Sequence, residues 1–132
     1  MKYGKIFYDY VNRTARESAE ALLVPVVDAL QATSLVDFGC GEGMWLSVAK
    51  SHFPKVEILG FDGDYVEPTN LKIEKNYFHA ADLTQYISVP KKYDLAISLE
   101  VAEHIPSEKS DVFLDNLCNA SDTVLFSAAI PG

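Results

Sequence analysis

The stretch that decides the fold is Val36-Asp37-Phe38-Gly39-Cys40-Gly41-Glu42-Gly43. An apolar run ends here in three alternating glycines, Gly39, Gly41 and Gly43, and a helical pattern follows directly. Glycine has no Cβ, so it permits a tight turn and lets a ligand approach the backbone closely. The helix that follows would direct its N-terminal N–H groups toward such a ligand. The pattern predicts a strand, a glycine-rich turn and a helix beside a ligand site, although an ordinary tight turn explains it equally well.

Predicted strands and helices alternate along the chain. Short apolar runs predict strands at residues 34–38, 56–61, 77–80, 93–99 and 122–129. Apolar residues at helical spacing predict helices at residues 5–31, 42–53, 65–74 and 107–118. Pro25 should break or kink the first helix near residue 24, with a second piece starting at Pro25. Such alternation is typical of right-handed βαβ units, so we expect an α/β, doubly wound parallel sheet with helices on both faces.

Length and composition limit the class of protein. The 132 residues fit one domain, which we divide into an N-terminal helical segment (residues 1–31) and a core (residues 32–132). The formal net charge of -8 disfavours binding to phosphate backbones. Two distant cysteines, Cys40 and Cys118, predict a reduced, cytoplasmic setting. No apolar run reaches the roughly 18 residues that cross a bilayer, so we expect no membrane partner.

The glycine loop departs from the dinucleotide-binding pattern. That pattern would place its third glycine where Met44 stands. Two carboxylates, Asp37 and Glu42, would also face a pyrophosphate. The loop therefore favours a ligand that carries a positive charge, and a nicotinamide oxidoreductase becomes the weaker alternative.

Two further acids follow predicted strands. Asp62 ends the second strand about 20 residues beyond the glycines, where a carboxylate can accept both hydroxyl hydrogens of a ribose. Asp64 lies past the strand end and is better explained as a turn residue. Asp82 follows the third strand, where it can accept a hydrogen bond from an exocyclic amine such as that of adenine. Taken singly, Asp82 would be interpreted as a turn cap.

Three polar residues, Glu100, Glu103 and His104, cluster at the carboxyl end of the fourth strand. If this segment is helical, Glu100 and His104 lie one turn apart and could serve as a base near a substrate. In the structural alternative, Glu103 caps or pairs locally and His104 is packed. We expect no metal site, since no other His or Cys has ligand spacing here.

The order and spacing of these features resemble the class I S-adenosylmethionine-dependent methyltransferases, in their small-molecule branch, over about residues 34–132. The matching motifs are VDFGCGEG at residues 36–43, Asp62, the pair Asp82–Leu83, and LEVAEHI at residues 99–105. The resemblance implies a Rossmann-like sheet of five strands in the order 3-2-1-4-5, without the family's strands six and seven. It also implies S-adenosyl-L-methionine as cofactor, with S-adenosyl-L-homocysteine as its product.

The resemblance further implies roles for single residues. The implied cofactor-binding set is Asp37, Gly39, Cys40, Gly41, Trp45, Asp62, Gly63, Asp82, Leu83, Leu99 and Glu100. Within it, Asp37 would bind the amino group of the methionine part, and Leu99 and Glu100 would approach the sulfonium. Trp45 would lie beside the cofactor or, equally, in the core of its helix.

The implied reaction is methyl transfer to a small-molecule oxygen or nitrogen, with His104 and Glu103 as candidate catalytic bases. The alternatives are a non-catalytic domain that binds S-adenosylmethionine or S-adenosylhomocysteine, and a fragment of a longer methyltransferase. An exposed, apolar fifth strand could also pair with a second copy to form a homodimer. The N-terminal aromatics could fold over the cofactor as a lid or pack their own helix; they are Tyr3, Phe7, Tyr8 and Tyr10.

Overall fold

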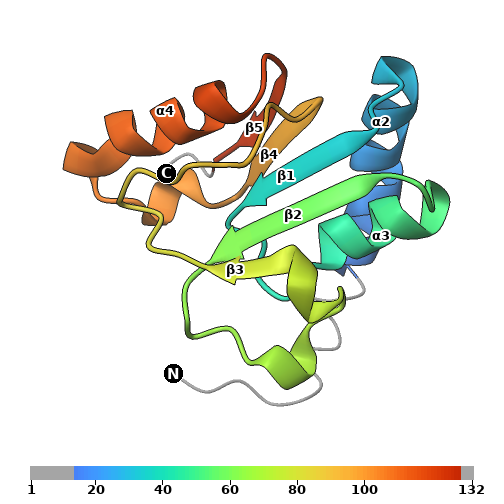
Figure 1. Cartoon of the computed structure of the whole chain (residues 1–132), viewed down its shortest axis with the longest axis horizontal. Coiled ribbons are helices and arrows are strands. Elements are labelled where there is room, and N and C mark those ends of the chain that lie inside the picture. Colours follow the sequence, from blue (N-terminus) through green and yellow to red (C-terminus); the bar gives the residue numbers. More distant parts are fainter. Residues whose placement is uncertain (1–13, 129–132) are drawn as a thin grey trace.

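The computed structural model describes residues 14–128, which contain one five-stranded sheet. Its strands are β1 (Ser34–Phe38), β2 (Glu57–Asp62), β3 (Phe78–Ala80), β4 (Leu95–Leu99) and β5 (Val124–Ser127). They lie in the order β3-β2-β1-β4-β5, and neighbouring strands pair in parallel (Figure 1). The predicted α/β class and the strand order are therefore confirmed.

Helices cover both faces of the sheet. On one face lie α2 (Val24–Leu30) and α3 (Met44–His52), and on the other lies α4 (Ser110–Ala120) (Figure 1). Strand β1 is buried throughout, and successive side chains point to opposite faces. Leu35 accordingly joins the core under α2 and α3, whereas Val36 joins the core under α4.

The break or kink predicted near residue 24 takes the form of a change in helix type, not of a break. Residues 14–18 are helical, η1 (Ala19–Leu23) continues them as a π-helix, and α2 follows without interruption. In the π-turn the N–H of Val24 donates to the carbonyl of Ala19, five residues back. Pro25 has no N–H to donate, and the π-turn changes the hydrogen-bond register just ahead of it. The helix is thus modified at the predicted place but not interrupted. The aromatic lid, Tyr3 to Tyr10, lies outside the described residues.

The predicted helix at residues 65–74 is wrong. The segment holds only one short 3-10 turn, η2 (Pro68–Asn70), and a second, η3 (Lys75–Tyr77), follows it. Most of its residues are exposed, and Leu71 and Ile73 are only half-buried. A short helix is marginal unless it buries an apolar face, so this segment remains an irregular loop between β2 and β3.

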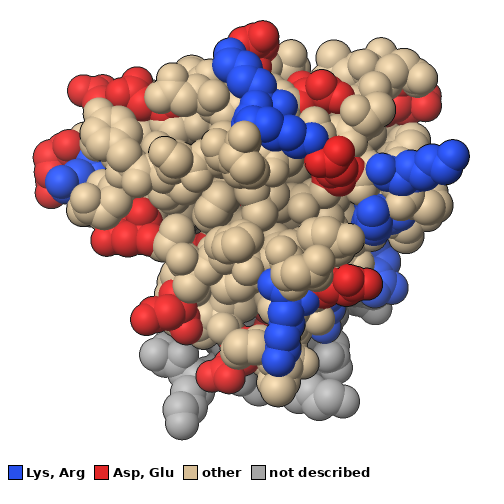
Figure 2. All heavy atoms as spheres, in the orientation of Figure 1, with Lys and Arg blue, Asp and Glu red and all other residues tan. Residues whose placement is uncertain are grey.

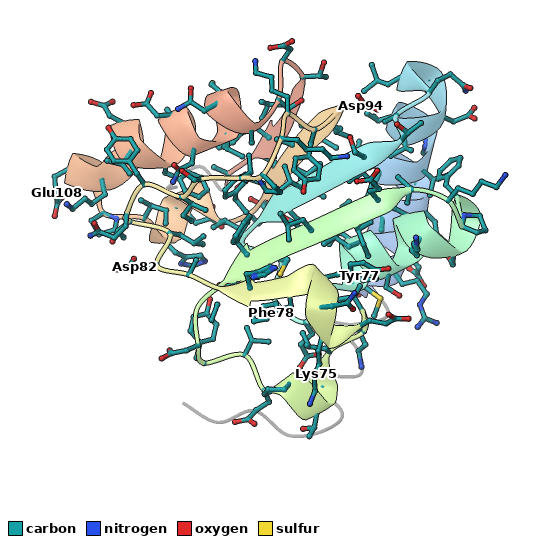
Figure 3. All side chains as sticks on the ribbon, viewed as in Figure 1. Lys75, Tyr77, Phe78, Asp82, Asp94 and Glu108 are labelled. Atoms are coloured by element: carbon teal, nitrogen blue, oxygen red, sulfur yellow. The ribbon has the colours of Figure 1, made fainter. Side chains whose placement is uncertain are left out.

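The two ends of the sheet differ. At the amino end, the Asp94 carboxylate accepts hydrogen bonds from the backbone N–H and the hydroxyl of Thr33, at 2.8 and 2.9 Å, which lowers the pKa of Asp94. These bonds tie the start of β4 to the residue before β1. Figure 3 shows Asp94 and Asp82 at opposite ends of the sheet. The carboxyl end, where Asp82 lies, opens into the larger cavity described below.

Two features relate to possible partners: the exposed edge of the sheet, and the length and apolar character of the helices. Strand β5 forms an edge of the described sheet, and Phe126 on it is 43% exposed. Pairing of this edge with a second copy remains a prediction. Among residues 14–128, no helix combines the length and the apolar character that crossing a bilayer requires.

Candidate functional site

A cavity of about 840 Å³ opens at the carboxyl ends of the strands. Its walls come from the end of β1, the β2–β3 loop, the segment after β3 and the segment after β4. The lining residues are Gly39, Asp62, Gly63, Asp64, Tyr65, Ala80, Ala81, Asp82, Leu83, Thr84, Leu99, Glu100, Val101, His104 and Ile105. This volume lies within the roughly 300–1,000 Å³ of small-molecule sites, and its position is the one expected for a doubly wound sheet.

The Asp62 carboxylate joins the glycine loop to the cavity. Its Oδ2 accepts the backbone N–H of Gly41 at 2.7 Å, and its Oδ1 accepts the backbone N–H of Gly63 at 2.8 Å. Asp62 is 5% exposed and lines the cavity wall. These bonds fix the orientation of the carboxylate, so a hydroxyl-bearing ligand would find a pre-positioned acceptor.

Three backbone N–H groups of the glycine loop are bonded to β2. The N–H groups of Gly39 and Cys40 both donate to the carbonyl of Phe61, at 2.8 and 3.1 Å, and that of Gly41 donates to the Asp62 carboxylate. A phosphate cradle needs free N–H groups that point at the ligand. These three N–H groups are therefore not free to bind a pyrophosphate, which agrees with the absence of the third glycine at Met44.

Gly39 also makes room for the segment after β4. Its φ is +97°, and a Cβ added to it would come within 2.4 Å of Cγ2 of Val101. A residue with a Cβ would be strained at that φ and would also collide with Val101, so the position requires glycine. The glycine turn and residues 100–101 are therefore packed together as one wall of the cavity.

Glu100 adopts a left-handed backbone conformation, with φ +59°. Its N–H donates to the carbonyl of Ser127 at 3.0 Å, which ties the turn to β5. The helix that would have placed Glu100 and His104 one turn apart is absent: only a 3-10 turn, η4 (Ala102–His104), follows. A strained non-glycine residue at the rim of a cavity is a frequent mark of a functional site.

His104 and Glu103 lie at the outer rim. His104 Nε2 is 3.7 Å from Glu103 Oε1, and the His104 side chain is 77% exposed. The packed-histidine alternative therefore does not hold, because the imidazole faces solvent and the cavity. The described residues contain no group of three His, Cys, Asp or Glu side chains arranged to hold a metal ion.

Asp82 serves as a turn cap and also lines the cavity. Its Oδ1 accepts the hydroxyl and the backbone N–H of Thr84, at 2.6 and 2.9 Å, and these bonds lower the pKa of Asp82. The structural interpretation of Asp82 as a cap is thus correct. Its second oxygen is not used in this turn, so capping leaves an acceptor for a ligand amine.

Asp37 and Cys40 lie behind the loop, away from the cavity lining. Burial, with a contribution from the Asp62 charge, raises the pKa of Asp37 to about 8. Burial likewise raises the pKa of the Cys40 thiol, so this side chain stays protonated. A Cβ on Gly60 would come within 2.7 Å of Cys40 Sγ, which places the thiol in the core beneath the loop.

Most, but not all, of the predicted site residues meet at the cavity. Those that line it are Gly39, Asp62, Gly63, Asp82, Leu83, Leu99, Glu100 and His104. Those outside the lining are Asp37, Cys40, Gly41, Trp45 and Glu103. Trp45 packs against the core clusters around α3, so the structure favours its core interpretation.

The sequence reasoning missed several lining residues. Tyr65 belongs to the segment that was expected to be a helix, whereas Val101 and Ile105 lie within the LEVAEHI segment but were assigned no role. For Thr84 the signal was a hydroxyl two residues after an aspartate, which is typical of a capped turn. For Tyr65, the incorrect helix assignment concealed the contact.

The cavity is acidic. Its lining holds the carboxylates of Asp62, Asp64, Asp82 and Glu100, and no lysine or arginine among the described residues. On the face drawn in Figure 2, charged groups of both signs are scattered among large uncharged areas. The local field at the cavity is thus negative, which favours cationic or neutral ligands over anionic ones.

Comparison of the sequence with models of known protein families shows to which family the chain belongs. Residues 7–127 match the family described as "Methyltransferase domain". The chain belongs to this family. The resemblance inferred from the glycine loop, Asp62, Asp82 and the segment after β4 is therefore confirmed. No curated protein sequence matches the chain.

Solved methyltransferase structures share the fold. The methyltransferase domain of bacterial CtHen1 is 24% identical in sequence, with a TM-score of 0.70. The alignment covers 84% of this chain and 65% of the CtHen1 chain. CalS10, an amino pentose methyltransferase from Micromonospora echinaspora solved with S-adenosylmethionine bound, is 16% identical with a TM-score of 0.72 (98% and 58% covered). The plantazolicin methyltransferase BpumL, solved with a substrate analogue and S-adenosylhomocysteine, is 22% identical with a TM-score of 0.67 (89% and 48% covered). The chain thus spans about half to two thirds of each of these proteins.

The raised pKa of Asp37 predicts a pH-dependent stability. The unfolded chain loses the Asp37 proton near its ordinary pKa of about 4, whereas the folded chain keeps it up to about pH 8. The free energy of unfolding should therefore fall as pH rises between these values. Asp37→Asn cannot ionise, so its stability relative to wild type should rise across this window, by roughly 1.4 kcal/mol per pH unit, and then level off.

Urea denaturation of both proteins at about pH 5, 7 and 9 measures this difference. Asp28→Asn, at an exposed position on α2, is the matched control and should show no such trend. A stability difference between Asp37→Asn and wild type that stays constant from pH 5 to 9 would show that Asp37 ionises normally in the folded chain.

Proposed function

We propose that the chain binds S-adenosylmethionine and transfers its methyl group to a small-molecule oxygen or nitrogen. The observation that carries this proposal is the Asp62 carboxylate, oriented by two backbone N–H groups at the wall of the cavity. Membership of the methyltransferase family and the ligands named for CalS10 and BpumL support the same cofactor.

The residues present fit this cofactor. Asp62 would accept hydrogen bonds from the ribose hydroxyls, and Asp82 with Leu83 would contact the adenine. The carboxylates around the cavity complement a ligand that carries an ammonium and a sulfonium. When bound, S-adenosylmethionine supplies a methyl group on a positive sulfur for in-line displacement.

The contribution of the protein would be chiefly positioning. Methyl transfer from a sulfonium depends on holding the acceptor in line with the breaking bond, and orientation accounts for much of such catalysis. Leu99 and Glu100, at the end of β4, would form the wall beside the reacting atoms. His104 would accept the proton of an acceptor that must lose one, with Glu103 3.7 Å away to favour the resulting positive charge.

The acidic cavity wall limits the class of acceptor. An anionic acceptor, such as a phosphate ester, would meet Asp64 and Glu100 without a lysine or arginine from the described lining. Neutral hydroxyl compounds and amines meet no such penalty. The acceptor is therefore proposed to be a small neutral or cationic molecule.

Calorimetry with S-adenosylhomocysteine tests cofactor binding. Asp62→Ala should raise the Kd by about 10- to 100-fold, because two hydrogen bonds to a charged acceptor are lost. Glu67→Ala, in the same β2–β3 loop but outside the cavity lining, is the control and should leave the Kd unchanged. Absence of binding by wild type, or equal binding by Asp62→Ala with an intact thermal transition, would contradict the proposed function.

Transfer of labelled methyl groups separates an enzyme from a non-catalytic binding domain. With methyl-labelled S-adenosylmethionine and a pool of small amines and alcohols, label should appear in a specific acceptor. For an acceptor that must lose a proton, His104→Ala should slow this transfer by about 10²-fold while the Kd for S-adenosylhomocysteine stays within twofold. Cofactor binding without transfer to any acceptor of the pool would instead favour the non-catalytic alternative.

A further inference from the structure

Tyr65 lies within the candidate site but has no part in the function proposed above. It follows Asp62 by three residues in the irregular loop between β2 and β3, and it lines the cavity. Its phenol hydroxyl donates a short hydrogen bond to Asp62 Oδ1. Tyr65 is 74% exposed, so burial of an apolar ring does not explain this position.

The hydrogen bonds that Asp62 already accepts leave too few acceptor positions for both hydroxyls of a ribose. Each carboxylate oxygen has two lone pairs that can accept. Oδ2 uses one of them for the N–H of Gly41, whereas Oδ1 uses both, for the N–H of Gly63 and the hydroxyl of Tyr65. Counting the bonds from the described residues, one acceptor position on Asp62 remains, although two ribose hydroxyls need two.

We propose that Tyr65 occupies the position of one ribose hydroxyl on Asp62, and that an adenosyl ligand displaces its phenol on binding. This inference rests on the proposed function, because it requires that Asp62 binds the ribose. Tyr65 is then a positioning residue: it holds the carboxylate in place in the free chain and competes with the ligand for it.

The surroundings of Tyr65 permit the displacement. The loop that carries it contains no α-helix, so no packed helix face fixes the tyrosine backbone. The ring lies over Gly63, where an added Cβ would come within 2.3 Å of Tyr65 Cε1, and most of it faces solvent. Exposed side chains change rotamer within nanoseconds, so the phenol can leave faster than a ligand binds.

The phenol remains a donor over the useful pH range. Although most of the side chain is exposed, partial burial of the phenol and its hydrogen bond to Asp62 raise the pKa of Tyr65 to about 12. The hydroxyl therefore keeps its proton at neutral pH. The competition between Tyr65 and a ribose should accordingly not vary with pH between about 6 and 9.

Removal of the hydroxyl tests the inference. Tyr65→Phe keeps the ring but loses the competing hydrogen bond, so the Kd for S-adenosylhomocysteine should fall by about 3- to 10-fold. Tyr86→Phe is the matched control. Its phenol also faces an aspartate, Asp115 at 3.4 Å, but it lies outside this cavity and is 68% exposed, so its loss should leave the Kd unchanged.

The NMR chemical shift of the Tyr65 ring reports on the hydrogen bond of its phenol. The ¹³Cζ resonance of Tyr65, assigned by its absence in Tyr65→Phe, should move upfield on saturation with S-adenosylhomocysteine as the bond to the carboxylate is lost. If wild type binds the ligand in an Asp62-dependent manner but Tyr65→Phe binds no more tightly, or if ¹³Cζ does not move, the inference is overturned while the proposed function stands. Failure of wild type to bind S-adenosylhomocysteine overturns both.

Discussion

The hydrogen bond from the Gly41 N–H to the Asp62 carboxylate is the interaction on which the site depends. It joins the loop after β1 to the end of β2, and so connects the two parts of the chain that would hold opposite portions of one ligand. The same carboxylate faces the cavity. The bond therefore helps to fix both the path of the loop and the orientation of the Asp62 carboxylate.

Burial of carboxylates sets the chemistry of this end of the sheet. Asp37 and Asp62 are both almost fully buried at neighbouring strand ends, and the raised pKa of Asp37 is a consequence of that burial and of the nearby Asp62 charge. Buried acids are unfavourable unless they are compensated. A cation bound at the loop would provide compensation, so the feature that disfavours the free chain would favour a positively charged ligand.

Much of the fold could be predicted because short apolar runs mark the strands and glycines mark the turn after β1. The run Ser34–Phe38 is buried throughout, so its apolar composition predicted a buried strand, whereas the alternation of strands and helices predicted the parallel sheet. The errors lie where tertiary context decides. The π-turn before Pro25 lets the helix continue through a residue that usually breaks one. Residues 65–74 have apolar residues at helical spacing but no surface to pack against.

The candidate site was predicted less completely than the fold. Asp62 and Asp82 could be located because strand ends meet at one edge of a parallel sheet. The left-handed turn at Glu100 and the contact of Tyr65 with Asp62 depend on loop conformations that no short motif specifies. Asp37 could be identified as chemically relevant, but its position behind the loop follows only from the packed structure.

A crystal structure of the chain with S-adenosylhomocysteine would show whether Asp62 binds the ribose. We expect both ribose hydroxyls within about 3 Å of the Asp62 carboxylate, with the adenine beside Asp82 and Leu83. A ligand bound elsewhere, or bound here with its ribose away from Asp62, would show that Asp62 is not the ribose-binding residue.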